Sequence, residues 1–127
     1  MSAETLLCFE LDQGRYGVST DLVREVQRAA LPVALPNAPP AVRGLLNVRG
    51  ELIPLIDLRA TLRLPARPLR ASDQLVICRV GERTLCFAVD RAIELTPMRS
   101  DLVIPDLAAL LDPDAERQLD RALTAVT

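Results

Sequence analysis

The sequence predicts an all-β protein with a single C-terminal helix, and three patterns lead to this prediction. Short segments with apolar side chains at every second position alternate with turn signals that contain glycine and aspartate. Ten prolines interrupt the stretches in which a long helix would otherwise form. Only the last part of the chain, residues 113–126, repeats apolar residues at helical spacing. A chain of 127 residues, half of them hydrophobic, can build one compact domain or two very small fused barrels.

A first β-hairpin is predicted near the N-terminus. Residues 6–11 place Leu7, Phe9 and Leu11 on one face of a strand, and residues 15–18 return after a turn. The next segment, residues 19–26, permits two interpretations. Its first three residues are polar and suit a helix cap, and the apolar residues that follow lie four positions apart, as in a helical turn. We therefore expect a helical turn there, with a bent strand as the alternative.

Residues 44–58 form the most informative stretch of the chain. Two apolar arms flank a polar Asn-Val-Arg-Gly tip, which is typical of two buried strands joined by an exposed turn. Gly50 can adopt the positive φ that a tight turn requires. Arg49 would then stand at the tip, where its guanidinium can address a partner. Asn47 is expected to bond to the backbone of its own turn, and Pro54 marks an edge position or a bulge.

The remaining elements follow from similar patterns. Four prolines in residues 31–42 predict an extended crossover before the 44–58 hairpin. A second hairpin-like half begins after a short helical turn, and its expected strands are residues 74–80, 84–89 and 92–95. Asp112 and Pro113 are a helix start signal, and the helix is expected over about 113–126. The whole chain, residues 1–127, is expected to be a single domain.

The composition argues against several classes of function. The chain has no histidine, and all 15 basic residues are arginine, so the commonest general base, the commonest metal ligand and Schiff-base lysine are missing. Cys8, Cys78 and Cys86 are expected to be buried, reduced apolar residues. We therefore expect no cofactor and no metal. A net charge of −2 argues against nucleic acid, and the lack of a long apolar run or signal sequence predicts a cytoplasmic protein without membrane insertion.

Five groups of short motifs occur in order from about residue 6 to residue 96. They are Phe9-Glu10-Leu11 with Tyr16-Gly17-Val18, Val23-Arg24-Glu25-Val26, Pro36-Asn37-Ala38-Pro39, Gly44-Leu45-Leu46-Asn47-Val48-Arg49-Gly50 with Pro54 and Asp57-Leu58-Arg59, and Val89-Asp90-Arg91-Ala92-Ile93-Glu94-Leu95. Their order and spacing resemble those of the CheW-like chemotaxis coupling proteins. The resemblance implies two small SH3-like β-barrels and a non-enzymatic adaptor. Such an adaptor joins a methyl-accepting chemotaxis receptor to a CheA-type histidine kinase at the cytoplasmic, receptor-associated side of a bacterial two-component system.

The resemblance also implies which residues bind protein partners. Glu25 and Arg49 match the family's functional surface residues, and Asn47 belongs to the same turn as Arg49. The receptor tip is expected in an apolar groove between the two barrels. For the lining of that groove the expected residues are Leu22, Val26 and Ile93.

The chain departs from the family pattern after Leu95. A glycine-marked hairpin of the usual family member is missing, and residues 107–126 resemble the family's final strand and helix. One barrel is therefore expected to be incomplete, with its open edge hidden by a homodimer or covered by another segment. The shortening puts the kinase contact in question. The alternative function is a truncated module that binds receptors or dimerises without normal kinase coupling. A carboxylate-dependent hydrolase using Asp57 and Asp90 is a further alternative, which the missing histidine and lysine disfavour.

Overall fold

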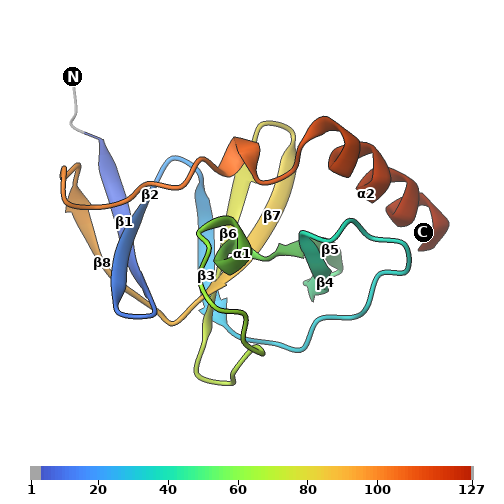
Figure 1. The fold of residues 1–127 in the computed structure, drawn as a ribbon, viewed down its shortest axis with the longest axis horizontal. Helices are drawn as coiled ribbons and strands as arrows, with labels where there is room; N and C mark the ends of the chain where they lie inside the picture. The colour runs from blue at the N-terminus through green and yellow to red at the C-terminus, as the bar shows by residue number, and fades with distance from the viewer. Residues whose placement is uncertain (1–3, 127) are drawn as a thin grey trace.

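The computed structural model describes residues 4–126, and its strands form two sheets that pack against each other (Figure 1). The elements of the described chain are, in order, β1 (Thr5–Leu11), β2 (Gly14–Ser19), β3 (Val23–Arg28), β4 (Val42–Val48), β5 (Glu51–Ile56), α1 (Leu58–Thr61), β6 (Gln74–Val80), β7 (Arg83–Val89), β8 (Arg91–Pro97), the 3₁₀ helix η1 (Leu107–Ala109) and α2 (Pro113–Val126). The predicted all-β class with one terminal helix is confirmed.

The larger sheet has five strands in the order β3-β6-β7-β5-β4. Its strands pair antiparallel except β5 and β7, which run parallel. The sheet curls around its own apolar interior, and ion pairs from β3 to the β4–β5 hairpin join its two outer strands. It is therefore an SH3-like half barrel whose seam is closed by side chains and not by backbone pairing. The interior residues are Leu46, Val48, Ile53, Leu55, Leu75, Ile77 and Cys86.

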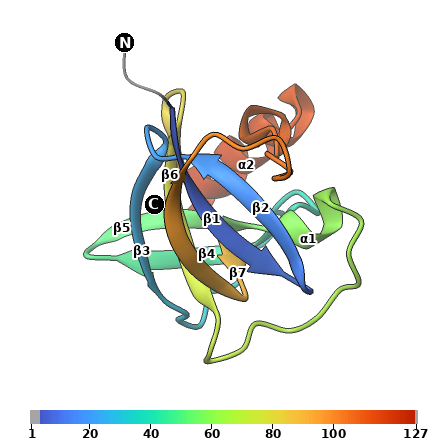
Figure 2. The same ribbon diagram turned by 90° about the vertical axis from the view of Figure 1, so that its left-hand side faces the viewer.

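The smaller sheet has three strands in the order β2-β1-β8, and it faces the viewer in Figure 2. One of its faces carries Leu6 and Cys8, which are covered by Leu102 from the segment that follows β8. The same segment borders β2, where the Gly17 N–H donates to the Val103 carbonyl at 3.0 Å. The expected incomplete barrel is therefore present. A homodimer or another segment was expected to cover its open edge. At β2 the covering element is the segment after β8, whereas β8 itself remains an edge strand.

A shared core joins the two sheets. Phe9 from the smaller sheet lies at its centre, with ring centroids 5.8 Å from Tyr16 and 5.6 Å from Phe87. Burial of such aromatic and aliphatic surface is the main source of folding free energy. α2 contributes Leu119 and Ala122 to this core and lies at the end of the molecule farthest from the three-stranded sheet (Figure 1).

Two local expectations were wrong. The segment expected as a helical turn is strand β3, because Val23 and Val26 pair with β6 and the preceding polar residues form a turn instead of a helix cap. In that turn the Asp21 N–H donates to Ser19 Oγ at 3.3 Å. The final strand expected near residue 107 is also absent from the described chain, where Val103 makes a single bridge and η1 follows. Pro105 lies between them and cannot donate to a ladder.

Helix α2 spans residues 113–126, as expected, and the Asp112 carboxylate accepts from the Ala115 N–H at 2.7 Å. This contact is the cap that the sequence predicted. Across residues 4–126 no helix has the length and apolar character needed to cross a bilayer.

Candidate functional site

The β4–β5 turn presents Arg49 in a strained conformation. Arg49 has φ 51° and Gly50 has φ 87°, so both central residues of the two-residue turn lie in the left-handed region that matches the strand twist. Gly50 reaches this region freely, whereas an arginine does so only at a cost. The Asn47 side chain steadies the turn by accepting from the Gly50 N–H at 2.8 Å, as predicted. A non-glycine residue held in this way is a recognised mark of functional sites.

Arg49 and Glu25 form a bidentate ion pair across the seam of the five-stranded sheet. Arg49 Nη1 lies 3.3 Å from Glu25 Oε1, and Nη2 contacts Oε2. The hydrogen bonds from Arg49 lower the pKa of Glu25, and those to Glu25 raise the pKa of Arg49, so both stay charged at neutral pH. The Arg49 side chain is 67% exposed and that of Glu25 is 25% exposed, which leaves the arginine free to contact a partner as well. Arg24 and Glu51 form a second pair at 2.8 Å beside it.

An apolar surface lies where the two sheets face each other. Val26 of β3 pairs with Val76, a residue of the shared core, and Leu95 of β8 pairs with Leu7 of the same core. Residues directly opposite each other in a ladder share a face, so Val26 and Leu95 belong to the inward-facing sides of the two sheets. Both remain open to solvent, with exposures of 36% and 66%. We call Val26 and Leu95 the inter-sheet patch.

Of the other two predicted groove residues, one packs on the same shared core and the other lies on the far side of the smaller sheet. Leu22 is partly buried against the shared core. Ile93 packs with Leu6, Cys8 and Leu102 on the opposite side of the smaller sheet. A bulge causes this placement, because Cys8 pairs with Glu94 and the next residue of β1 pairs with Ala92, which leaves Ile93 as the extra residue. Simple alternation puts residues 93 and 95 on one face, so the sequence pattern did not reveal that Leu95 takes the expected position of Ile93.

A second exposed apolar surface was not anticipated from the sequence. Leu31 is 91% exposed and Val33 is 65% exposed on the proline-rich segment between β3 and β4. The segment is held in place, because the Val33 N–H and carbonyl both bond to Leu45 at 2.7 and 2.8 Å. Beside it lies a hollow of about 170 Å³ lined by Ala29, Ala30, Leu31, Leu69, Arg70 and Ala71. We call Leu31, Val33 and Leu69 the Leu31 patch.

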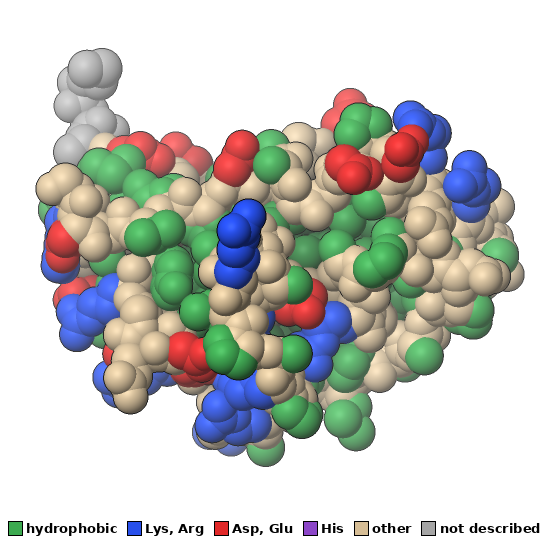
Figure 3. Space-filling model, viewed as in Figure 1, with side chains coloured by type: hydrophobic (Ala, Val, Ile, Leu, Met, Phe, Trp, Pro, Cys, Tyr) green, Lys and Arg blue, Asp and Glu red, His purple; other side chains and the backbone are tan. Residues whose placement is uncertain are grey.

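The Leu31 patch depends on a glycine at the start of the hairpin. Gly44 has φ 149°, and a Cβ atom there would lie 2.8 Å from the Val33 carbonyl oxygen. Only glycine therefore allows the proline-rich segment to approach β4 this closely. Figure 3 shows hydrophobic and arginine side chains side by side along the lower edge of the molecule, below β3.

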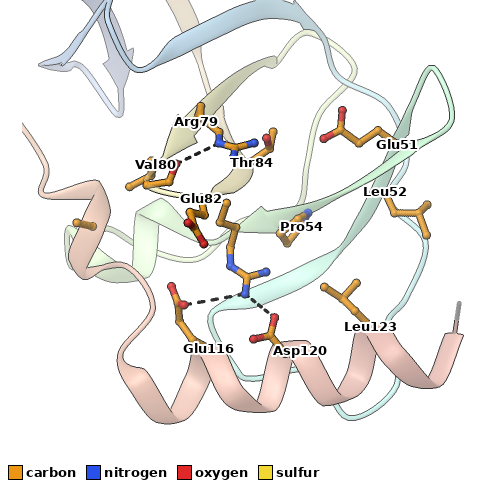
Figure 4. Close-up of a pocket in the computed structure, with 13 residues that line it drawn as sticks. Glu51, Leu52, Pro54, Arg79, Val80, Glu82, Thr84, Glu116, Asp120 and Leu123 are labelled. Carbon is orange, nitrogen blue, oxygen red and sulfur yellow. Dashed lines mark hydrogen bonds and ion pairs between the residues drawn. The ribbon is translucent and has the colours of Figure 1, made fainter.

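A hollow of about 760 Å³ lies between α2, the β6–β7 turn and the start of β5 (Figure 4). Arg83 reaches across it to Asp120 at 2.6 Å and to Glu116 at 4.0 Å. These contacts fasten α2 to β7. The hollow is wide and mostly polar, and none of the motifs from the sequence lies at its centre.

The carboxylates of the hydrolase alternative are engaged separately. Asp57 caps α1 by accepting from the Ala60 N–H at 3.2 Å. Asp90 accepts from Arg67 and from the Asp12 N–H. The arrangement therefore gives no support to a paired acid and base.

The described residues 4–126 contain no cluster of three or more histidine, cysteine or acidic side chains suited to a metal ion. The cysteines are free and buried, and burial raises the pKa of Cys78 and of Cys86 to about 12. Thiols with such pKa values are poor nucleophiles at neutral pH.

Comparisons with known proteins agree with this architecture. A family model described as a CheW-like domain matches residues 5–117. The chain is 25% identical to a probable chemotaxis protein CheW of Rhizobium etli over 95% of this chain and 77% of that protein. It is 31% identical to the chemotaxis protein CheW of Treponema pallidum over 68% of this chain and 53% of that protein.

Among solved structures, the scaffolding protein TtCheW from Thermoanaerobacter tengcongensis superposes with a TM-score of 0.78, at 19% identity, over 91% of this chain and 92% of that one. The fold is therefore shared even where the sequences have diverged. Because the family model spans most of the chain, the protein belongs to the CheW-like domain family.

Proposed function

We propose that this chain is a non-enzymatic cytoplasmic adaptor that couples a chemotaxis receptor to a CheA-type histidine kinase. Family membership supports this proposal. The observation that carries the proposal is the Glu25–Arg49 pair. Its arginine is strained and largely exposed, at a turn whose sequence matches the family motif. An adaptor of this kind acts through a coupling free energy between two binding sites.

The receptor is proposed to bind beside the Glu25–Arg49 pair and on the inter-sheet patch. Val26 follows Glu25 directly on β3, so neighbouring residues of one strand, on its two faces, contribute the charged pair and the apolar patch. Leu22, which packs on the shared core, is proposed to belong to the same surface, whereas Ile93 packs on the opposite side of the smaller sheet.

The kinase regulatory domain is proposed to bind the Leu31 patch. A leucine exposed to 91% on a segment held by backbone hydrogen bonds is a rigid apolar anchor. Exposed apolar clusters of this kind commonly mark protein–protein contacts. Val26 lies within β3 and Leu31 follows the end of that strand, so one continuous segment contributes to both patches.

The decisive experiment separates an internal ion pair from a partner contact. Arg49→Glu is expected to weaken association with the receptor's signalling tip at least about tenfold, since a good charged contact at an interface is worth a few kcal/mol. The control is the double variant Glu25→Arg with Arg49→Glu, which restores the internal pair with its charges exchanged. Binding is measured by titration calorimetry and folding by circular dichroism.

Each variant has an informative result. If the double variant binds as weakly as Arg49→Glu while both remain folded, the arginine contacts the receptor directly. Recovery of binding in the double variant would show that the pair only shapes the turn. Wild-type affinity for Arg49→Glu would reject the proposed role of Arg49.

A second candidate function is a receptor-binding module that dimerises without normal kinase coupling. One observation favours it, since β8 is the edge strand of the three-stranded sheet and an open edge is suited to pairing with another strand. Size-exclusion chromatography with light scattering tests it. A stable dimer that fails to bind the kinase domain would favour this function over the adaptor.

A further inference from the structure

An ion-pair network connects the two sheets where the chain passes from one to the other. We call it the inter-sheet network, and its members are Asp12, Arg59, Arg67, Asp73 and Asp90. Asp90 is the single residue between β7 of the five-stranded sheet and β8 of the three-stranded sheet. Asp12 lies in the β1–β2 turn of the smaller sheet. The remaining three residues follow β5 or precede β6 of the larger sheet, so the network has members on both sides of the junction.

Asp90 is held from three directions. Its carboxylate accepts from Arg67 and from the Asp12 N–H at 2.8 Å, and Arg59 Nη1 lies 3.9 Å from the same group. Arg59 also bonds to the Asp12 carboxylate at 2.5 Å and to the Pro65 carbonyl at 2.8 Å. These contacts hold the β1–β2 turn of the smaller sheet against α1, which follows β5 of the larger sheet.

Arg67 and Asp73 anchor the network to the larger sheet. Arg67 makes two hydrogen bonds of 2.9 Å to Asp73, which also accepts from the Arg70 N–H at 2.8 Å. Asp73 is 3% exposed and Arg59 is 6% exposed. Buried ion pairs seldom add net stability compared with apolar side chains, but they define one relative placement of the parts that they join.

We propose that the inter-sheet network locks the relative orientation of the two sheets, with Asp90 as its central positioning residue. This inference rests on the proposed adaptor function for its biological role, since the inter-sheet patch has one residue on each sheet. A fixed angle between the sheets keeps Val26 and Leu95 in register for the receptor. It also transmits receptor binding to the larger sheet, which carries the Leu31 patch. Hydrogen-bond and ion-pair networks of this kind are one physical means by which two sites are coupled.

Residual dipolar couplings of backbone N–H groups test directly, without any partner, whether the two sheets keep one relative orientation. In the wild type, amides of the two sheets should fit one alignment tensor. In Asp90→Asn, the amides of β1, β2 and β8 should require a separate, weaker tensor, because the central charge that binds Arg67 and Arg59 is gone. Asp12→Asn provides a milder variant, since it removes only the charge that pairs with Arg59 and leaves the buried members intact. Asp120→Asn is the matched control, because it breaks the ion pair between α2 and β7 within the larger unit.

The second readout is the coupling between partners. The affinity for the kinase regulatory domain is measured with and without saturating receptor tip, and typical coupling factors are about 5-fold or more. Asp90→Asn should reduce this factor toward one and weaken receptor binding, because Val26 and Leu95 lose their fixed register, while the separate affinity for the kinase domain changes less than about threefold. One common tensor in both Asp90→Asn and Asp12→Asn would overturn the lock. Separate tensors together with an unchanged coupling factor would show that the inter-sheet network does not transmit receptor binding to the kinase site. If the wild type binds neither partner, the adaptor function fails, and the dipolar couplings still decide whether the sheets are locked.

Discussion

The two sheets of this protein bury their apolar side chains in different ways. The five-stranded sheet encloses its own apolar interior and closes its seam with two ion pairs. The three-stranded sheet has too few strands to do so, and a single loop residue, Leu102, covers its outer face. Its other face depends on the shared core, to which it contributes Leu7 and Phe9. The comparison teaches that a small sheet without an interior of its own can be held by packing its inner face on a larger one.

The largest expected difference between the sheets concerns their interiors. Ile77→Ala removes a fully buried side chain from the five-stranded interior and should lower the free energy of unfolding by about 2–5 kcal/mol. Leu102→Ala should cost about 2 kcal/mol or less, because its loop can move to fill part of the cavity. Urea unfolding followed by circular dichroism measures both. An equal or larger loss for Leu102→Ala would contradict the view that the smaller sheet adds little interior of its own.

A second prediction concerns the pH dependence of the network that joins the sheets. Burial alone would raise the pKa of Asp73, but hydrogen bonds from Arg67 and from the Arg70 N–H outweigh it, so the pKa is lowered on folding. A lowered pKa contributes stability that is complete above about pH 4, the unfolded value, and is lost as the pH falls further. Asp73→Asn should therefore flatten the decline in the free energy of unfolding below about pH 4. Parallel curves for wild type and variant would rule out this contribution.

A third prediction compares the two faces of β8. Leu95→Ser should change the free energy of unfolding by no more than about 0.5 kcal/mol, because the side chain is mostly exposed, yet it should weaken receptor binding. Ile93→Ser should instead lower the free energy of unfolding and leave receptor binding nearly unchanged, because Ile93 packs against the cluster of Leu6, Cys8 and Leu102. Thermal unfolding and titration calorimetry on the two variants separate these effects. Stronger loss of receptor binding in Ile93→Ser would restore the original assignment.

The smallest expected effect is at the seam of the larger sheet. Arg24→Gln removes the ion pair in which Arg24 Nη1 lies 2.8 Å from Glu51 Oε1. The Arg24 side chain is 36% exposed and the Glu51 side chain is 45% exposed. Exposed pairs contribute under about 1 kcal/mol, and salt screens them. The variant should therefore unfold close to the wild type, with any difference vanishing at high salt. A loss of several kcal/mol would mean that the seam pairs hold the sheet together and do not merely close it.

Much of the fold was predictable because strand alternation and turn residues are local signals. The 44–58 hairpin, its Asn47 contact and helix α2 with its Asp112 cap all follow from residues close together in the sequence. The family resemblance, carried by motifs in order, is confirmed by a match over most of the chain. The segment expected as a helical turn became β3 because pairing with β6 outweighed a weak local preference.

The candidate surfaces were predicted less completely, for physical reasons. The bulge at Ile93 shifts side chains to the other face, and its position depends on the partner strand. The exposure of Leu31 depends on how Val33 is fastened to Leu45. The inter-sheet network brings together residues up to 78 positions apart, as in the bond from Asp12 to Asp90, so no local pattern reveals it.

The most direct test of the adaptor proposal is whether the purified chain holds both partners at once. A receptor tip fragment and a kinase regulatory domain, each added separately and then together, are followed by analytical ultracentrifugation. The proposal predicts two binary complexes and a larger ternary complex that contains one copy of this chain. Competition between the two partners for the chain, or binding of neither, would contradict it.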